Sequence, residues 1–187
     1  MTTWFTSDHH FGHANIIKYC NRPFSSAEEM DEEMIRRWNE KVDALDLVYY
    51  IGDFSLRGGV YRNSIVNRLN GDITFIPGSH DPSPYDEPNW RAKEPMIAIH
   101  TKIQEKNLIV LCHYALRSWN RSHYGSWHLF GHHHGRLEPY GLSFDVGVDT
   151  NNFYLYSLED VAEKMKTLSP IVDYSRKREQ IGHPRTF

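Results

Sequence analysis

Five short segments of the sequence combine aspartate, histidine and glycine in a pattern that suits metal binding. They are Asp8-His9-His10, Gly52-Asp53, Gly78-Ser79-His80-Asp81, His113 and Gly131-His132-His133-His134-Gly135. Carboxylate oxygens and imidazole nitrogens are common ligands of divalent transition metals. Each segment begins where a short apolar run ends. The sequence therefore predicts a metal centre whose ligands come from several loops.

The apolar runs before these segments are predicted to be buried strands, at residues 4–6, 47–51, 73–76, 108–111 and 128–130. In open α/β sheets, ligands bind beyond the carboxyl ends of the strands, so the five segments are expected to meet at one site. This expectation separates them from isolated histidines, which are usually structural or exposed.

Helices are predicted between and after the strands. One has Ser25 or Ser26 as its N-cap, with Glu28 or Glu29 completing a capping box. A second covers about residues 60–69, and a third begins at residues 157–160. The early alternation predicts parallel strands, whereas the closely spaced runs at 143–148 and 153–156 are expected to form an antiparallel portion. The predicted fold is an α/β sandwich with one or two mixed sheets.

Length and composition limit the possible functions. The chain has 187 residues and a formal net charge of -3, so one domain is expected and no global field attracts nucleic acid. Two cysteines and no signal-like or membrane-spanning run favour a cytoplasmic protein. Residues 1–170 are the expected domain, and residues 171–187 are expected to be a polar C-terminal extension or an oligomer contact.

The order of the five segments resembles the calcineurin-like metallophosphoesterase superfamily, which includes calcineurin and the purple acid phosphatases. Its motifs are Asp-x-His, Gly-Asp, Gly-Asn-His-Asp or Glu, His and Gly-His-x-His, and the match extends from residue 3 to about residue 160. Phe11-Gly12-His13 and Arg22-Pro23-Phe24 further resemble a compact single-domain subfamily. The resemblance implies an αββα sandwich with mixed sheets and a dinuclear metal-dependent hydrolase.

The same resemblance implies a role for each matching residue. Metal one would be held by Asp8, His10 and His134, metal two by His113 and His132, and both by Asp53. A hydroxide bridging the metals would attack phosphorus. His80 would act as general acid, with Asp81 as a carboxylate that orients it.

Position 79 departs from the family pattern, in which an asparagine amide oxygen binds metal two. Ser79 is a shorter and weaker donor, so metal two is expected to be held loosely. Three explanations stay open: natural variation with a water in the gap, an engineered substitution, or a degenerate site that binds without turnover.

We expect a phosphatase or phosphodiesterase that acts on phosphomonoesters or small phosphodiesters, including nucleotides and cyclic nucleotides. The alternatives are a single-strand nuclease of the DNA-repair type and a catalytically weakened phosphate-binding protein. Manganese is the first candidate metal, with iron, zinc or nickel as alternatives. A homo-oligomer is compatible with the sequence. Candidate substrate contacts are His13, Arg22 and Arg117, while Tyr114 and Trp119 could stack on a base or pack in the core.

Overall fold

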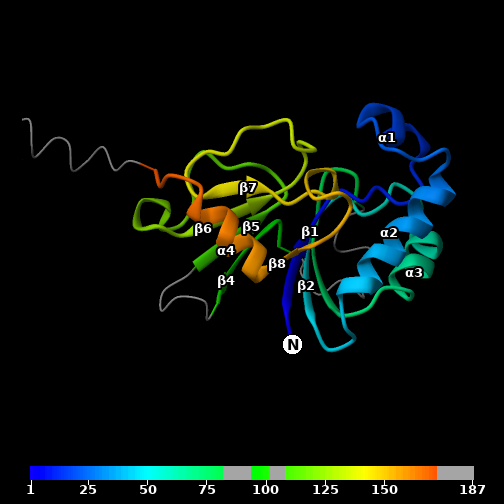
Figure 1. Cartoon of the computed structure of the whole chain (residues 1–187), viewed down its shortest axis with the longest axis horizontal. Coiled ribbons are helices and arrows are strands. Elements are labelled where there is room, and N and C mark those ends of the chain that lie inside the picture. Colours follow the sequence, from blue (N-terminus) through cyan, green and yellow to red (C-terminus); the bar gives the residue numbers. More distant parts are fainter. Residues whose placement is uncertain (82–93, 102–107, 172–187) are drawn as a thin grey trace, which may run out of the picture.

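The structure is a computed structural model that describes residues 1–81, 94–101 and 108–171 (Figure 1). Predictions for the tail after Ile171, including its basic run at 176–178 and His183, lie outside the described residues. The strands are β1 (Thr3–Thr6), β2 (Leu47–Ile51), β3 (Asp72–Ile76), β4 (Met96–His100), β5 (Leu108–Cys112), β6 (Trp127–Phe130), β7 (Ser143–Asp145) and β8 (Tyr156–Ser157). The helices are α1 (Ala14–Tyr19), α2 (Ala27–Lys41), α3 (Gly59–Val66) and α4 (Leu158–Lys166), with 3-10 turns at Ser122–Tyr124 and Val148–Thr150.

The strands form two mixed sheets, which confirms the expected α/β class. The first sheet has the order β3-β2-β1-β8, with β1, β2 and β3 parallel and β8 antiparallel to β1. The second has the order β4-β5-β6-β7, with β5, β6 and β7 parallel and β4 antiparallel to β5. The carboxyl ends of three parallel strands in each sheet are therefore available to carry a site.

The prediction that residues 143–148 and 153–156 form an antiparallel portion is wrong for the first segment, and the second pairs antiparallel with a strand of the other sheet. Strand β7 is parallel to β6 in the second sheet, whereas β8 joins the edge of the first sheet. The chain crosses between the sheets at Gly147, which forms a bridge to Ser7, and at the 3-10 turn that follows. Phe153 has a positive φ of 61°, so an extended strand cannot begin there.

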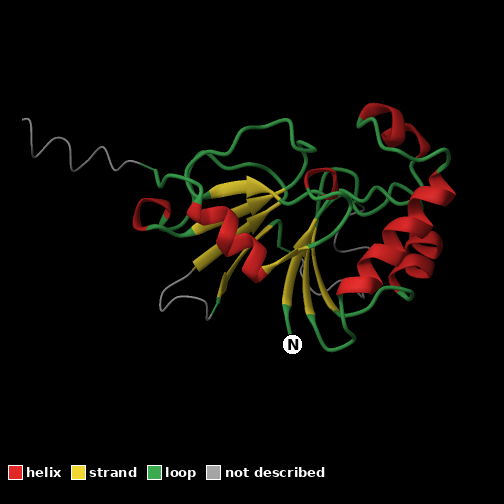
Figure 2. Ribbon diagram, viewed as in Figure 1, coloured by secondary structure: helices red, strands yellow, loops and turns green. Residues whose placement is uncertain are grey.

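The sheets pack face to face, and helices α2 and α3 cover the outer face of the first one (Figure 2). The inner core contains Phe5 and Ile51 from the first sheet and Ile109 and Leu129 from the second. Helix α4 closes one side of this core with Val161 and Met165. On the outer face of the second sheet, Leu108 and Val110 pack against Trp119, Leu116 and Ile171, so the described residues place a loop rather than a long helix there.

The helix signals in the sequence are largely confirmed. Ser26 is the N-cap of α2 and accepts a hydrogen bond from the backbone N–H of Glu29, and Trp38 on the same helix is fully buried. Ser157 and Asp160 form the capping box of α4. Helix α3 ends at Val66, earlier than predicted, because the chain turns through Asn67 toward Gly71, whose φ is +97°. Among the described residues, no helix is both long and apolar enough to cross a membrane.

Candidate metal centre

All five aspartate and histidine segments lie immediately beyond the carboxyl ends of parallel strands, as predicted. Three follow β1, β2 and β3 of the first sheet, and two follow β5 and β6 of the second. Hydrogen bonds join the two sets: the backbone N–H of His132 donates to the Asp8 carboxylate at 2.9 Å, and Nδ1 of His113 lies 2.9 Å from the carbonyl oxygen of Ile51 on β2. The carboxyl ends of the parallel strands in the two sheets therefore meet at one site.

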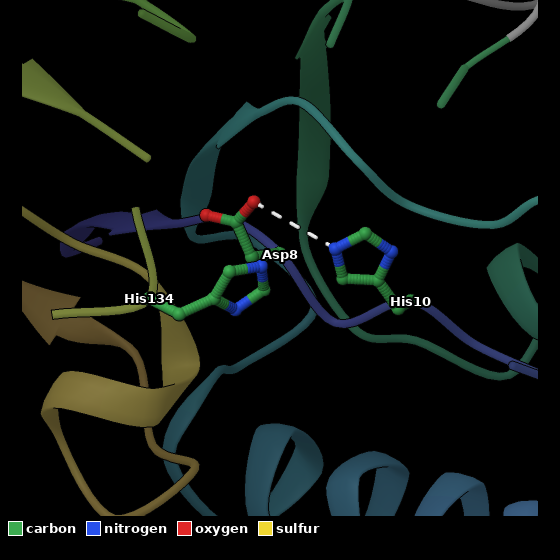
Figure 3. Close-up of side chains that lie close together, drawn as sticks. All are labelled: Asp8, His10 and His134. Carbon is green, nitrogen blue, oxygen red and sulfur yellow. Dashed lines mark ion pairs between the residues drawn. The ribbon is translucent and has the colours of Figure 1, made fainter. Parts of the chain in front are cut away.

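One cluster at this edge consists of Asp8, His10 and His134, whose ligand atoms all lie within 4.8 Å of one another. Figure 3 shows Asp8 and His10 on the segment after β1 and His134 on a different segment beside them. The Nε2 atom of His10 lies 3.9 Å from Oδ1 of Asp8. The three residues predicted to hold metal one are therefore brought together.

A second cluster consists of Asp53, His113 and His132, whose ligand atoms also lie within 4.8 Å of one another. The Oδ2 atom of Asp53 lies 3.4 Å from Nε2 of His113 and 3.7 Å from Nε2 of His10. A single carboxylate oxygen therefore lies between a histidine of one cluster and a histidine of the other.

Several polar atoms at the centre of the site are buried without a hydrogen-bond partner. Among the described residues these include Oδ1 of Asp8, Nε2 of His10 and Nε2 of His113. A buried polar atom that lacks a partner costs about 1–3 kcal/mol. The three atoms belong to the two clusters, so divalent cations would satisfy them, and the donor set fits a pair of such cations.

In two of the histidines, a hydrogen bond at Nδ1 determines the ring tautomer. Nδ1 of His113 lies 2.9 Å from the carbonyl oxygen of Ile51, and Nδ1 of His134 lies 2.7 Å from Oδ2 of Asp149. Because both partners are acceptors, each Nδ1 carries a hydrogen, and in the neutral form of each ring Nε2 keeps its lone pair. Ligating histidines in metalloproteins are oriented in this manner.

The backbone of the site is left-handed at five of its ligands. The φ angles are 60° at Asp8, 54° at His10, 59° at Asp53, 70° at His132 and 51° at His134. This conformation costs about 1–2 kcal/mol for a residue that carries a Cβ atom, and such strain concentrates at functional sites. Tight left-handed turns after the strands are what point these side chains at a common centre.

Two glycines keep the carboxylates in place. A Cβ atom added to Gly131 would lie 2.3 Å from Oδ2 of Asp8, and one added to Gly78 would lie 2.3 Å from Oδ1 of Asp53. No larger residue fits at either position, so the glycines of these motifs are part of the site.

Burial controls the protonation of the ligands. It raises the pKa of Asp8 to about 7 and lowers the pKa of His10 to about 3. Burial opposes ionisation of Asp53 and His113 too, but contact between them prevails: the pKa of Asp53 falls below its ordinary value and that of His113 rises to about 9. A cation would take the place of the proton on Asp8 and keep this carboxylate ionised.

Residues 79 and 80 lie at the exposed rim of the site. Oγ of Ser79 lies 3.4 and 3.3 Å from the two carboxylate oxygens of Asp53. The backbone N–H of His80 donates to Asp53 at 2.8 Å, and the His80 ring centroid is 5.3 Å from that of His10. The predicted general acid thus stands beside the metal ligands and is accessible to solvent.

Asp81 does not have the role that was predicted for it. Its carboxylate accepts hydrogen bonds from the backbone N–H groups of Asp53, Phe54 and Gly78, at 2.7 to 2.9 Å. Asp81 therefore ties the loop after β3 to the loop after β2. Its carboxylate holds the backbone at Asp53 rather than the ring of His80.

Arg22 is not placed as a substrate contact. Its guanidinium is fully buried, forms a forked ion pair with Asp149 and donates to the carbonyl oxygens of Asp8 and His9. A remaining N–H lies 3.4 Å from the sulfur of Met30. No donor is left for a substrate.

The other predicted contacts differ in position. His13 caps α1 at the site, with its ring 5.7 Å from that of His10. Arg117 is exposed, and its guanidinium lies 4.5 Å from the centre of the Tyr140 ring, so no ligand contact is shown for it. Tyr114 is 48% exposed and packs its ring against His132, whereas Trp119 is buried in the core.

The remaining histidines are structural or peripheral. His9 points away from the ligands, is buried and bonds through Nδ1 to the hydroxyl of Tyr50 at 3.0 Å. His128 is also buried and bonds to the carbonyl oxygen of Val110 at 3.0 Å. His133 is half-buried beside the ring of His132. His100 and His123 are exposed.

Asp149 is the residue of the site that sequence reasoning missed. Burial opposes its ionisation, but hydrogen bonds from His134 and Arg22 prevail and lower its pKa to about 2. Asp149, His134 and Cys20 also form a third group of candidate ligand atoms. A signal was available, because Asp149 lies just beyond an apolar run, as the five predicted segments do.

Fold and site together define a two-sheet α/β protein with a candidate dinuclear metal centre. The chain is 34% identical over 184 residues to the uncharacterized protein MJ1445 of Methanocaldococcus jannaschii, an alignment that covers 91% of this chain and 96% of that protein. The chain belongs to the family of this archaeal protein. It is also 33% identical over 82 residues to the gene 66 protein of Mycobacterium phage L5, which covers 42% of this chain and 39% of the phage protein.

The fold is similar to the crystal structure of a protein of unknown function, AQ665 of Aquifex aeolicus. The TM-score is 0.69, and the superposition covers 87% of this chain and 98% of that one at 17% identity. At this identity the likeness concerns the fold. No family model matches the chain.

Proposed function

We propose that the chain is a two-metal phosphoesterase of the calcineurin-like type, with the metallophosphoesterase form of the two-sheet sandwich. The observation that carries the proposal is the position of Asp53 Oδ2, 3.4 Å from His113 and 3.7 Å from His10, between two clusters of ligands. Manganese is the first candidate metal. Two divalent cations supply an activated water and neutralise charge that develops on phosphorus.

The protein's own residues supply the positioning and the proton. Left-handed turns at the candidate ligands would hold their donor atoms in place before a metal or a substrate arrives. His80 stands at the solvent-exposed rim and can protonate the oxygen of the leaving group, because its ring is held close to His10 by the backbone bond to Asp53. His13, on the same side of the site, can hydrogen-bond a phosphate oxygen that does not react.

The rim favours a small phosphate ester. Among the described residues, the ring of Tyr114 is exposed beside His132, so a planar group such as a nucleobase can lie against it. Arg117, in the loop that follows Tyr114, is also exposed, and its guanidinium lies over the ring of Tyr140. Nucleotides and cyclic nucleotides are therefore included in the proposed substrate class.

The test is hydrolysis by protein loaded with Mn²⁺. The panel contains a nitrophenyl phosphate monoester, a nitrophenyl diester, an alkyl phosphodiester, a cyclic nucleotide and a labelled single-stranded oligonucleotide. We expect turnover of at least one small ester, its loss in a chelator and its loss in Asp53→Asn. If none of the esters is hydrolysed with any divalent transition metal, the proposal fails; preference for the oligonucleotide would assign a nuclease instead.

The role of His80 has a sharper signature. A general acid contributes about 10²–10⁴-fold to the rate, but only where the leaving group needs a proton. His80→Ala should therefore slow hydrolysis of the alkyl ester far more than that of the nitrophenyl ester. His123→Ala, which removes an exposed histidine elsewhere, is the matched control and should leave both rates unchanged. An equal loss on both esters would contradict the assignment of His80.

A further inference from the structure

A buried ion pair lies directly behind the metal-one cluster. Arg22 and Asp149 are 127 residues apart in sequence, and two of their contacts, Nε to Oδ1 and Nη2 to Oδ2, measure 2.8 and 2.7 Å. The Arg22 side chain is 0% exposed and that of Asp149 is 9% exposed. Burial of both charges is costly unless the geometry is good and the remaining donors and acceptors are paired.

Apart from a contact between Arg22 and the sulfur of Met30, the remaining contacts of the pair reach His134 or the backbone of residues 8 and 9. Oδ2 of Asp149 accepts from Nδ1 of His134 at 2.7 Å. Arg22 donates through Nη2 to the carbonyl oxygen of Asp8 at 2.7 Å and through Nη1 to that of His9 at 2.8 Å. One ion pair therefore touches both loops that carry the metal-one ligands.

These contacts have two physical effects. The carboxylate of Asp149 requires the hydrogen of His134 on Nδ1, so Nε2 is free to bind a cation, and the negative charge makes this nitrogen a better donor. The guanidinium of Arg22 fixes two successive carbonyl groups, and this holds Asp8 in its left-handed conformation. Both effects prepare the cluster before a metal arrives.

The metal-two cluster is oriented by other groups. The tautomer of His113 is fixed by the backbone carbonyl of Ile51, and Asp53 is held by the loop that Asp81 organises. The group of Cys20, His134 and Asp149 does not offer a competing cation site, since both carboxylate oxygens of Asp149 already bond to the positive charge of Arg22.

We propose that Arg22 and Asp149 are positioning residues for metal one, acting through His134 and the backbone of Asp8, and that metal two does not depend on them. This inference rests on the metal centre of the proposed function and not on the reaction. Loss of such an outer contact typically weakens metal binding by about 10–100-fold.

The experiment measures binding of Mn²⁺ and Co²⁺ to the whole metal-free protein by calorimetry, for the wild type and Asp149→Asn. We expect two sites in the wild type and, in the variant, a loss of about 10–100-fold at one site with the other unchanged. The matched control is Asp46→Asn, because Asp46 is also a buried carboxylate but accepts from Thr2 and Trp4 at the opposite end of the sheet. Its two affinities should equal those of the wild type.

A second readout separates positioning from mere stability. Nitrogen NMR of the metal-free protein should show the hydrogen of His134 on Nδ1 in the wild type and in Asp46→Asn, and a mixture of tautomers in Asp149→Asn. If Asp149→Asn does not fold, as judged by circular dichroism, Arg22→Lys is measured in its place. This variant keeps the charge but not the forked contact, and it should show the same selective loss of binding.

The outcomes distinguish the two proposals. Equal affinities at both sites in the wild type and the variants would overturn the positioning role and leave the proposed function standing. A selective loss in a protein that hydrolyses no phosphate ester would support the positioning role and overturn the function. A wild type that binds neither metal would overturn both.

Discussion

The ligand residues were predictable because their chemistry and their position agree. An aspartate or histidine that directly follows a buried apolar run, with glycine beside it, contributes little to core packing. A functional role is therefore the better explanation for it. Six predicted ligands, Asp8, His10, Asp53, His113, His132 and His134, fall into two clusters in the structure. The glycines of these motifs have a separate reason, because a Cβ atom at Gly78 or Gly131 would collide with a carboxylate of the clusters.

The residues that contact the candidate ligands from outside the two clusters were less predictable, because tertiary contacts determine their partners. The sequence shows Arg22 near the first motif but not Asp149, whose position opposite it depends on the crossing of the chain between the sheets. Asp81 stands next to His80 in sequence, yet its carboxylate is taken by three backbone N–H groups. Adjacency in sequence was a poor guide to these partners.

The exchange Ser79→Asn tests the departure from the family pattern. Ser79 Oγ lies 3.3 Å or more from Asp53 and is exposed, so it is a weak ligand at best. An asparagine amide reaches farther and should tighten the second metal site by about tenfold, with higher turnover at limiting metal. Calorimetric titration with Mn²⁺ measures the change, and Ser79→Ala is the control. Identical affinities in all three proteins would show that position 79 does not set metal occupancy.

At the scale of elements, strands with a strong apolar run and helices with caps were predicted, whereas short or exposed elements were not. Helix α1 has six residues and only Ile16 buried, so it gives no periodicity to detect. Strand β4 has a largely exposed edge pattern, and Met96 is 52% exposed. Strand β8 has two residues, of which only Tyr156 falls in the run predicted at 153–156, and its pairing with β1, which is distant in sequence, was not predicted.

The side chain of His128 on β6 connects strand β5 with the loop that covers the outer face of the second sheet. Nδ1 lies 3.0 Å from the carbonyl oxygen of Val110 on β5, and Nε2 accepts from the N–H of Leu116 at 3.2 Å in the loop that covers the outer face. Both ring nitrogens are satisfied only in the neutral form, because a hydrogen on Nε2 would oppose the N–H of Leu116. Burial accordingly lowers the pKa of His128 to about 4.

This connection predicts a pH-dependent stability. The unfolded chain binds a proton near the ordinary pKa of 6.5 and the folded chain only near 4, so stability is complete above pH 6.5 and is lost as pH falls toward 4. The loss from this residue should approach about 3 kcal/mol. Urea unfolding of metal-free protein between pH 7.5 and 4 measures it, and His128→Gln should lack this component. Parallel pH profiles for both proteins would contradict the assignment.

At the scale of the whole molecule, the family relationship and the fold agree in extent. The archaeal relative aligns over 91% of this chain, and the Aquifex structure superposes on 87% of it. Because the candidate site is divided between two sheets, binding of the proposed metals would require the complete fold, and this has a thermodynamic consequence.

Metal should stabilise the folded chain. A cation that binds only the native state at 100 times its dissociation constant adds about 2.7 kcal/mol. For a protein of this size, that corresponds to a rise in Tm of about 5–10 °C. Calorimetric scans with Mn²⁺ and with a chelator measure the difference, and Asp53→Asn should show little response. An unchanged Tm in the wild type would be evidence against the metal centre.

The division of the ligands between the sheets also bears on synthesis. When the first 81 residues have left the ribosome, three of the six clustered ligands, Asp8, His10 and Asp53, are present, and the other three are still to be translated. Neither cluster can close around an ion at that stage, since each draws at least one imidazole from the second sheet. The metal capture that we propose would therefore wait until His134 has been synthesised, and the nascent chain would not hold an ion in an incomplete site.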